Sequence, residues 1–208
     1  IEYAYHLMAL EAGIRMTECR LHNEGGRSHF MTKRFDRTVN GDKLHMQSLG
    51  AMAHFDYNQP ASYSYEQAIG VLKRLGVPRE DLEQLVLRAM FNVIGRNHDD
   101  HVKNIAFLMN RHGIWRLSPA YDISYSYDPN GHWTNQHQMS INGKHDSFTR
   151  QDLISLANFA GIKTAQATDM LNHTIGVISR WNELAKEVGI EKKRVEQIQK
   201  NMRTYLSS

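Results

Sequence analysis

The segment of residues 79–94 constrains the fold most, because its apolar residues recur at helical spacing along its whole length. These residues are Leu82, Leu85, Val86, Ala89, Met90 and Val93, and they share one face of a helix. Gly95 then interrupts the pattern, and the polar residues RNHDDH follow. The chain therefore contains an amphipathic helix that must bury one face. The polar loop after it is the first candidate for a functional site.

Similar periodicity predicts that helices dominate the chain after about residue 65. The predicted helices cover residues 2–11, 65–75, 79–94, 150–160, 164–189 and 191–206. Thr149 is a suitable N-cap for the fourth of them, and Gly161 ends it. We find no internal repeat and no low-complexity tract in the 208 residues.

Strand-forming residues concentrate between residues 14 and 35. Residues 14–22 and 28–35 favour strands, and the NEGGR segment between them is typical of a hairpin turn. A shorter hairpin is predicted from residues 105–109 and 113–118. Residues 40–63 and 122–147 are polar and rich in turn formers, so we expect irregular structure there and a mobile loop in the second segment. The predicted fold class is α+β, with a small β-hairpin attached to a mainly helical domain.

Composition narrows the cellular context. Cys19 is the only cysteine, so no internal disulfide can form, and we expect a reducing, cytoplasmic location. No apolar run is long enough to predict a membrane span. The net charge of +3 is compatible with an anionic partner but does not identify one. Because the chain opens inside a predicted helix and without a methionine, we expect it to be a piece of a longer protein.

The polar loop and a later aspartate together have the groups that phosphoryl transfer from ATP requires. Asp99 lies five residues before Asn104, and Asp122 follows 23 residues after Asp99, beyond an apolar hairpin. The hairpin can return the second loop beside the first. One carboxylate could then orient a hydroxyl and accept its proton, while an amide and a second carboxylate hold Mg²⁺.

Two other interpretations of the loop remain open. Residues 98–101 could belong to a metal site, with His98 and Asp99 as the paired ligands of a phosphohydrolase. Four consecutive residues cannot all converge on one ion, however, and Cys19 is remote, so a closed zinc site is not indicated. The segment could also be an ordinary solvated loop between a helix and a strand, where Asp, Asn and His are common.

The combination NHDDHVKN and LSPAYDIS, with its spacing, resembles the HipA-type serine/threonine kinases of bacterial toxin–antitoxin systems. The segment MTKRFDR resembles the hinge of that family, and the resemblance covers nearly the whole chain. It implies that residues 1–37 are a remnant of a kinase N-lobe and that residues 38–208 form a helical C-lobe. It also implies transfer of the ATP γ-phosphate to a protein serine.

The resemblance assigns roles to individual residues. Asp99 matches the catalytic base, and Asn104 and Asp122 match the magnesium ligands. The resemblance implies that Lys103 approaches the phosphates and that Glu2 pairs with a phosphate-binding lysine. It also implies that the backbone of Lys33 and Phe35 binds adenine and that the Asp36 side chain binds the ribose hydroxyls.

The chain also departs from the family pattern. The phosphate-covering loop and its strand lysine are expected upstream of Ile1, and Gly25 and Gly26 do not replace them because they belong to a hairpin turn. Asp100 occupies a position that is commonly glycine, and its extra carboxylate could raise the pKa of Asp99 or assist the metal. We therefore expect this piece alone to be inactive.

The resemblance implies three partners: a HipB-like antitoxin, operator DNA bound through the antitoxin complex, and a protein substrate such as an aminoacyl-tRNA synthetase. The basic residues 192–194 could touch DNA, although three adjacent charges at a helix start usually form a solvated face. The alternative function is a non-catalytic scaffold that binds antitoxin or DNA without turning over ATP.

Overall fold

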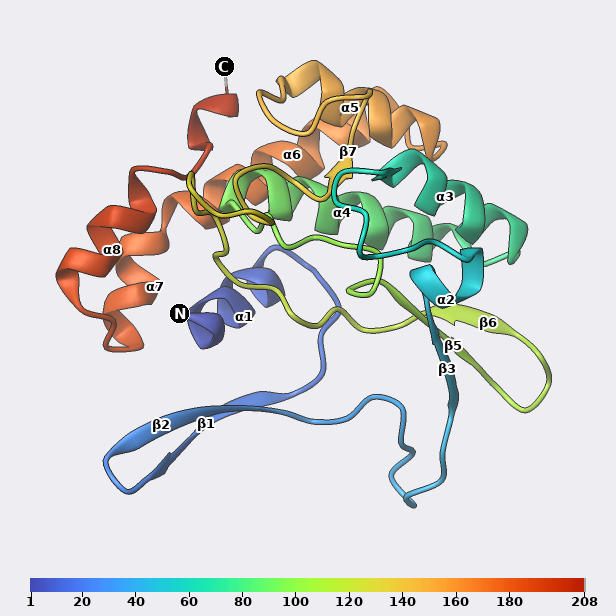
Figure 1. Cartoon of the computed structure of the whole chain (residues 1–208), viewed down its shortest axis with the longest axis horizontal. Coiled ribbons are helices and arrows are strands. Elements are labelled where there is room, and N and C mark those ends of the chain that lie inside the picture. The colour runs from blue at the N-terminus through green and yellow to red at the C-terminus, as the bar shows by residue number, and fades with distance from the viewer. Residues whose placement is uncertain (208) are drawn as a thin grey trace.

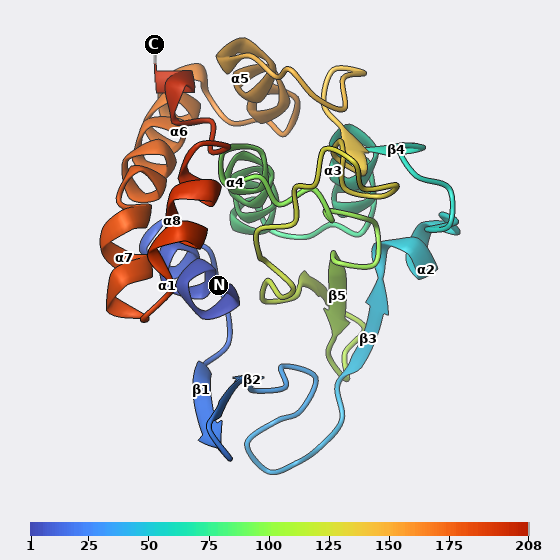
Figure 2. The same cartoon turned by 60° about the vertical axis from the view of Figure 1, so that its left-hand side comes forward.

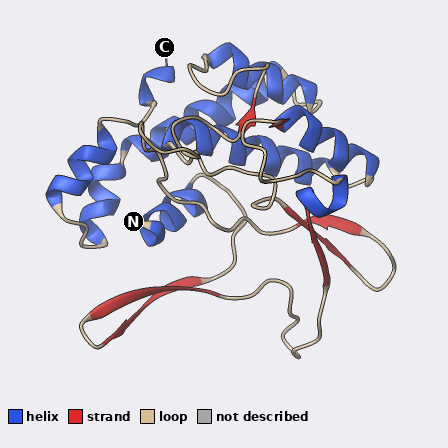
Figure 3. Cartoon of the chain, viewed as in Figure 1, coloured by secondary structure: helices blue, strands red, loops and turns tan. Residues whose placement is uncertain are grey.

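The computed structural model describes residues 1–207, and it has a helical body with small sheets at its edges (Figures 1 and 3). The helices are α1 (Glu2–Glu11), α2 (Leu49–Ala53), α3 (Tyr65–Arg74), α4 (Arg79–Gly95), α5 (Arg150–Phe159), α6 (Thr164–Ser179), α7 (Trp181–Glu187) and α8 (Lys192–Gln199), with a 3-10 turn at Thr204–Ser207. The strands are β1 (Cys19–Glu24), β2 (Arg27–Thr32), β3 (His45–Ser48), β4 (Tyr63–Ser64), β5 (Ala106–Met109), β6 (Trp115–Leu117) and β7 (Met139–Ser140). This arrangement confirms the predicted α+β class.

Helix α4 lies at the centre of the helical body, in contact with α3, α5 and α6. Its second half, from Leu85 to Gly95, is buried on every face, so the helix is more than the one-sided amphipathic element that the sequence indicates. The burial extends to Arg88 and Asn92, two polar residues within this half. The end of α4 is therefore fixed on all sides, and the loop that follows it starts from a rigid position.

Helix α1 packs into the helical body. Tyr5 is fully buried, its ring meets those of Phe91 and Trp181 edge-on, and its hydroxyl donates to the carbonyl of Gly95. The β1–β2 hairpin instead projects away from the helices (Figures 1 and 2). The division of the chain at residue 37 stays a prediction, but within residues 1–37 helix α1 and the hairpin have different surroundings.

The β1–β2 hairpin forms where the sequence predicts it, with Cys19 opposite Thr32 and Glu24 opposite Arg27. Gly25 and Gly26 form its turn with φ of 56° and 76°, a left-handed conformation that glycine adopts without steric cost. The predicted strand limits were wrong. Residues 14–18 are not in the hairpin, because Arg15 and Met16 run beside Ala120 instead, and β2 ends at Thr32.

Residues 40–63, predicted to be irregular, contain strand β3 and helix α2. Strand β3 pairs antiparallel with β5, which also pairs with β6 in the predicted 105–118 hairpin. The Ser48 hydroxyl accepts a hydrogen bond from the Ala51 N–H and caps α2. The prediction failed because β3 depends on a partner strand about 60 residues away.

Two further predictions need correction. The predicted helix over residues 164–189 breaks at Arg180 into α6 and α7, and the last predicted helix ends at Gln199. The segment 122–147 is largely irregular, as predicted, but it is anchored to the body. His137 is fully buried, and β7 pairs in parallel with β4.

Candidate functional site

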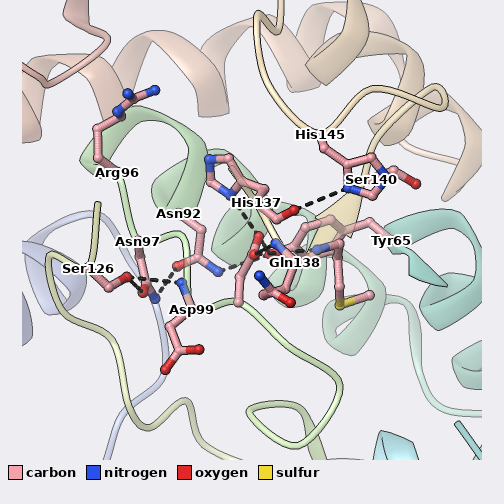
Figure 4. Close-up of polar contacts among 12 residues, drawn as sticks. Tyr65, Asn92, Arg96, Asn97, Asp99, Ser126, His137, Gln138, Ser140 and His145 are labelled. Atoms are coloured by element: carbon pink, nitrogen blue, oxygen red, sulfur yellow. Dashed lines mark hydrogen bonds and ion pairs between the residues drawn. The ribbon is translucent and has the colours of Figure 1, made fainter. Parts of the chain in front are cut away.

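The candidate site begins at the C-terminus of α4. Arg96 adopts a left-handed conformation with φ of 58°, which ends the helix and directs the chain into the loop of residues 97–104. Asp99 lies in this loop, and its side chain is 45% exposed. Its carboxylate points away from the neighbouring hydrogen-bonded cluster (Figure 4), and its Oδ1 lies 3.8 Å from Nε2 of His101. Asp99 is therefore accessible to a substrate group.

Asn104 is held against Asp99 by the loop itself. Its backbone N–H donates to the carbonyl of His101 at 2.9 Å, and its side-chain amide donates to the carbonyl of Asp99 at 2.8 Å. Because the NH₂ group makes this bond, the Oδ1 atom remains available as an acceptor or a metal ligand. One hydrogen bond thus both orients the amide oxygen and closes the loop around Asp99.

Asp122 lies on the second loop, which joins β6 to β7 (residues 118–138), and it lines the same pocket as Asn104. The Ala120 N–H donates to the carbonyl of Arg15 at 2.7 Å, which ties the approach to this loop to the segment after α1. Asp122 then adopts a left-handed conformation with φ of 56°. Asn104 and Asp122 line one pocket, and the Asp122 charge influences the ionisation of Asp99. Asn104 and Asp122 therefore share one pocket, and Asp99 lies on the loop beside it, where its carbonyl accepts a hydrogen bond from the Asn104 amide.

The electrostatics of the site raise the pKa values of two carboxyls, those of Asp99 and Glu2. Partial burial raises the pKa of the Asp99 carboxyl; His101 opposes this rise, and the negative charges of Asp122 and Asp100 add to it. Partial burial also raises the pKa of Glu2, and the charge of Asp122 contributes. Glu2 at the start of α1 is thus electrostatically coupled to the site. A divalent cation bound by Asp122 would offset the negative charge that acts on Asp99 and Glu2.

Asp100 has a different role from Asp99. It is buried, and its carboxylate accepts hydrogen bonds from the Tyr65 hydroxyl at 2.9 Å and from the Gln138 N–H at 2.8 Å, with Nδ1 of His137 at 2.9 Å. The expectation that Asp100 adds to the charge acting on Asp99 agrees with the rise in the Asp99 pKa. Its oxygens are occupied by these contacts, so Asp100 anchors the 137–139 segment.

His98 does not act with Asp99 as a ligand pair. It is fully buried, with its ring centroid 4.1 Å from that of His137 and 4.9 Å from that of Tyr127. Burial, followed by the nearby His137, holds the pKa of His98 far below its usual range. Within residues 1–207, no group of three or more His, Cys, Asp or Glu side chains is arranged to hold a metal. A phosphohydrolase site built on His98 is therefore not supported.

The predicted adenosine contacts lie on the segment after β2. The Lys33 N–H donates to the carbonyl of Glu18 at 2.9 Å, which fixes the backbone there, and the ring of Phe35 lies 5.4 Å from that of Tyr121. Asp36 accepts two hydrogen bonds from Arg34 at 2.8 and 2.6 Å and pairs with Arg37. The hydrogen bond from Arg34 is the main cause that lowers the pKa of Asp36 to about 2.

Lys103, next to Asn104, points toward an aromatic ring. Its Nζ lies 3.0 Å from the ring centroid of Tyr57 in a cation–π contact, and its carbonyl accepts a hydrogen bond from the Tyr121 hydroxyl. In this structure the ammonium group is therefore engaged outside the pocket that Asn104 and Asp122 line. A role at the phosphates would require the Lys103 side chain to change rotamer.

Sequence reasoning missed Arg88, which lies on α4 beneath the site. It is 4% exposed and lines the pocket with Asn104 and Asp122, and its Nη2 donates to the carbonyl of Ser118 at 2.6 Å. Burial, with the charge of Arg15 nearby, lowers the pKa of Arg88 to about 9. The signal available in the sequence was its position among the apolar residues of the 79–94 helix. Arginine is almost never fully buried unless it is paired, so an arginine at such a position indicates a specific partner or function.

Comparison with known proteins agrees with this geometry. Residues 1–207 match the family described as the HipA-like C-terminal domain. The chain belongs to this family. A Sinorhizobium fredii protein named "Putative kinase Y4mE" is 25% identical over 125 residues, which cover 56% of this chain and 30% of that protein.

A solved structure supports the fold independently. The chain is similar to one from a Shewanella oneidensis complex of the toxin–antitoxin proteins HipA and HipB with operator DNA. The TM-score is 0.73 at 17% identity, and the match covers 99% of this chain and 54% of the solved chain. The chain thus has the fold of a HipA-like C-terminal region and spans about half the length of that relative.

Proposed function

We propose that this chain is the C-terminal part of a protein serine/threonine kinase that transfers the γ-phosphate of ATP to a serine hydroxyl. The observation that supports this most is the convergence of Asn104 and Asp122 from two separate loops on one pocket, with Asp99 hydrogen-bonded to Asn104 on the loop beside it. Membership of the HipA-like family and the similarity to a protein named as a kinase agree with it.

Asp99 is the residue suited to act as the base. Its carboxylate is exposed, and the loop fixes its backbone on both sides, through the Asn104 amide and the Ser126 hydroxyl. A carboxylate with a raised pKa is a stronger base than an ordinary aspartate, provided that it is ionised at the working pH. Asp99 would orient the serine hydroxyl and accept its proton as the new P–O bond forms.

The residues around the pocket fit a magnesium–nucleotide complex. Asn104 and Asp122 offer one amide oxygen and one carboxylate, and Mg²⁺ is usually held by one or two such protein oxygens together with phosphates. The bound metal would neutralise the charge of the phosphates. The backbone of Lys33 and Phe35 would bind adenine. Asp36 would reach the ribose only if its contacts with Arg34 or Arg37 rearrange.

The biological setting follows from the family. We propose a cytoplasmic toxin of a toxin–antitoxin pair, with a HipB-like antitoxin and operator DNA as partners, because the similar solved chain comes from such a complex. An aminoacyl-tRNA synthetase is the proposed protein substrate. In residues 1–207, no helix is both long and apolar enough to cross a membrane.

The decisive experiment uses the full-length protein that contains this chain. Asp99→Asn should reduce phosphotransfer from radiolabelled ATP by about 10²–10⁴-fold, the usual effect of losing a positioned general base, while ATP binding persists. Asp169→Asn, an exposed aspartate on α6, is the matched control and should leave the rate unchanged. Turnover within a factor of two of wild type in Asp99→Asn would remove Asp99 from the mechanism.

A second experiment tests the metal ligands. Asp122→Asn should weaken binding of Mg²⁺–ATP more than binding of metal-free adenosine, because the carboxylate is proposed to contact the ion and not the nucleoside. Calorimetric titration with both ligands measures the difference. Equal losses would assign Asp122 a structural role. A wild-type protein that binds antitoxin but neither binds nor hydrolyses ATP would favour the scaffold alternative.

A further inference from the structure

A ring of hydrogen bonds lies behind Asp99 (Figure 4). The Asp99 backbone N–H donates to Ser126 Oγ at 2.9 Å, and the Ser126 hydroxyl donates to Asn97 Oδ1 at 2.9 Å. The Asn97 amide donates to Asn92 Oδ1 at 3.0 Å. Ser126 therefore links the second loop directly to the backbone of the proposed base.

The ring closes on the residue after Asp99. The Asn92 amide donates to the Tyr65 hydroxyl at 3.0 Å, and that hydroxyl donates to Asp100 Oδ2 at 2.9 Å. Asp100 is covalently joined to Asp99, so the path starts and ends on neighbouring residues. Every donor along it points in the same direction, an arrangement in which each hydrogen bond polarises the next.

Ser126 is the one ring member that lies neither on a helix nor on the loop that contains Asp99. Tyr65 is on α3, Asn92 is on α4, and Asn97 immediately follows α4, whereas Ser126 belongs to the same loop as Asp122. Its backbone N–H also donates to the carbonyl of Arg96 at 3.3 Å. Ser126 is thus attached at two points to the segment just before Asp99, four residues from the proposed metal ligand Asp122.

We propose that Ser126 is a positioning residue that sets the location of Asp99 relative to Asp122 by joining the two loops through its hydroxyl. The inference rests on the proposed kinase function and adds a residue to it. Ser126 touches no reacting atom; it acts through the Asp99 backbone. Without the hydroxyl, the Asp99 N–H and the Asn97 amide oxygen each lose a partner, and the two loops can move apart.

The kinetic test uses the full-length protein with Ser126→Ala, Ser126→Thr and Ser124→Ala. Misplacing a reacting group by about 1 Å can cost up to about 100-fold in rate, so Ser126→Ala should lower kcat by about 10- to 100-fold with the KM for ATP nearly unchanged. Ser126→Thr retains the hydroxyl and should restore most of kcat. Ser124→Ala removes a hydroxyl from the same loop that makes no hydrogen bond among the described residues, and it should match wild type.

A second readout does not depend on catalysis. Hydrogen exchange measured on this chain should show faster exchange of the Asp99 N–H in Ser126→Ala, with protection restored in Ser126→Thr and unchanged in Ser124→Ala. Unchanged protection in Ser126→Ala, or kcat lost equally in Ser126→Thr, would overturn the positioning role. If wild type transfers no phosphate while the exchange result holds, the proposed function fails and the link from Ser126 to Asp99 stands.

Discussion

Asp99 is the residue whose ionisation most directly affects the stability of the fold. Partial burial raises its pKa, and Asp122 and Asp100 contribute against the opposing effect of His101. A carboxyl whose pKa is raised by folding stabilises the fold while protonated, and that contribution is lost as pH rises through the folded-state pKa. At neutral pH the ionised Asp99 is therefore a small cost to stability.

Replacing this carboxyl should remove that cost. We expect Asp99→Asn to raise the melting temperature at pH 7 slightly, because solvent screens a side chain that is 45% exposed. The difference from wild type should shrink as pH falls below the ordinary range of aspartate. Thermal melts of both proteins from pH 3 to pH 8 check this. The exposed Asp169→Asn serves as control, and a lower melting temperature of Asp99→Asn at pH 7 would contradict the sign.

Tyr65 tests the buried polar ring behind the site. Tyr65→Phe removes a hydroxyl that bridges Asn92 and Asp100. The buried Asn92 amide and the buried Asp100 carboxylate then each lose one hydrogen-bond partner. The expected loss is about 1–3 kcal/mol of stability, or roughly 2–12 °C in melting temperature for a chain of this size. Tyr57→Phe removes an exposed hydroxyl and should change the melting temperature by less than about 1 °C. Equal melting temperatures for Tyr65→Phe and wild type would show that the ring contributes nothing to stability.

A network of side-chain hydrogen bonds holds the N-terminus of helix α5. Thr149 and Asp152 form a capping box, and Asp152 Oδ2 also pairs with Lys144 at 2.7 Å. Partial burial opposes ionisation of Asp152, but the hydrogen bonds from Lys144, Thr149 and Asn142 outweigh it and lower its pKa. A carboxyl with a lowered pKa stabilises the fold above its ordinary range, and this contribution is lost as pH falls through the folded-state pKa.

Asp152→Asn should therefore destabilise the protein at neutral pH and much less in acid. Hydrogen bonds to a charged group are worth about 1.5–3 kcal/mol, which corresponds to a decrease of roughly 3–12 °C in melting temperature at pH 7. Thr149→Ser keeps the capping hydroxyl and should melt within about 2 °C of wild type. Because the pKa of Asp152 is lowered well below the ordinary range, the comparison is made at pH 7 and pH 2. A decrease of the same size at both would show that the charge of Asp152 is not the cause.

The elements that the sequence predicts are those whose signals are local. The α4 periodicity, the glycine pair at the β1–β2 turn and the Thr149 cap each reside within one segment, and each predicted element is present. Strand β3 was missed because its stability depends on pairing with β5. The break at Arg180 has no proline or glycine to mark it. Tertiary packing decides such features.

The same distinction applies to the site. The spacing of Asp99, Asn104 and Asp122 suggested chemistry. The hairpin between the loops brings Asn104 and Asp122 to one pocket, and Asp99 is hydrogen-bonded to Asn104 beside it. Ser126 could not be found in this way, because a serine in a polar loop carries no signal until its contacts are known. The buried polar residues of α4 were visible as exceptions to an apolar stripe, but their partners were not.

In the whole molecule, the apolar core and the predicted nucleotide-binding segment lie in different parts of the fold. The buried apolar residues form one continuous cluster that runs through the helical body from α1 to the C-terminal 3-10 turn. The β1–β2 hairpin and the following segment, where the adenosine contacts are predicted, project from that body (Figure 2). The chain therefore has an apolar core on which its helical part can fold, while the segment predicted to contact adenosine lies outside that core.

The isolated chain should accordingly melt cooperatively but respond weakly to nucleotide. Around the pocket, the described residues present the acids Asp99, Asp122 and Glu2, and the ammonium of Lys103 lies over Tyr57. Catalysis of phosphoryl transfer relies on positive charge and aligned donors around the phosphates. Here Arg88 lines the pocket with its Nη2 engaged by the Ser118 carbonyl, so Mg²⁺ would have to offset most of the repulsion.

Saturating ligand at about 100 times its dissociation constant stabilises a protein by about 2.7 kcal/mol, or roughly 5–10 °C for this size. With millimolar Mg²⁺–ATP we expect a rise of less than about 1 °C and no transfer of radiolabel to any protein, whereas the full-length protein should show both. A rise of several degrees together with phosphotransfer by the isolated chain would show that residues 1–208 already contain a competent nucleotide site.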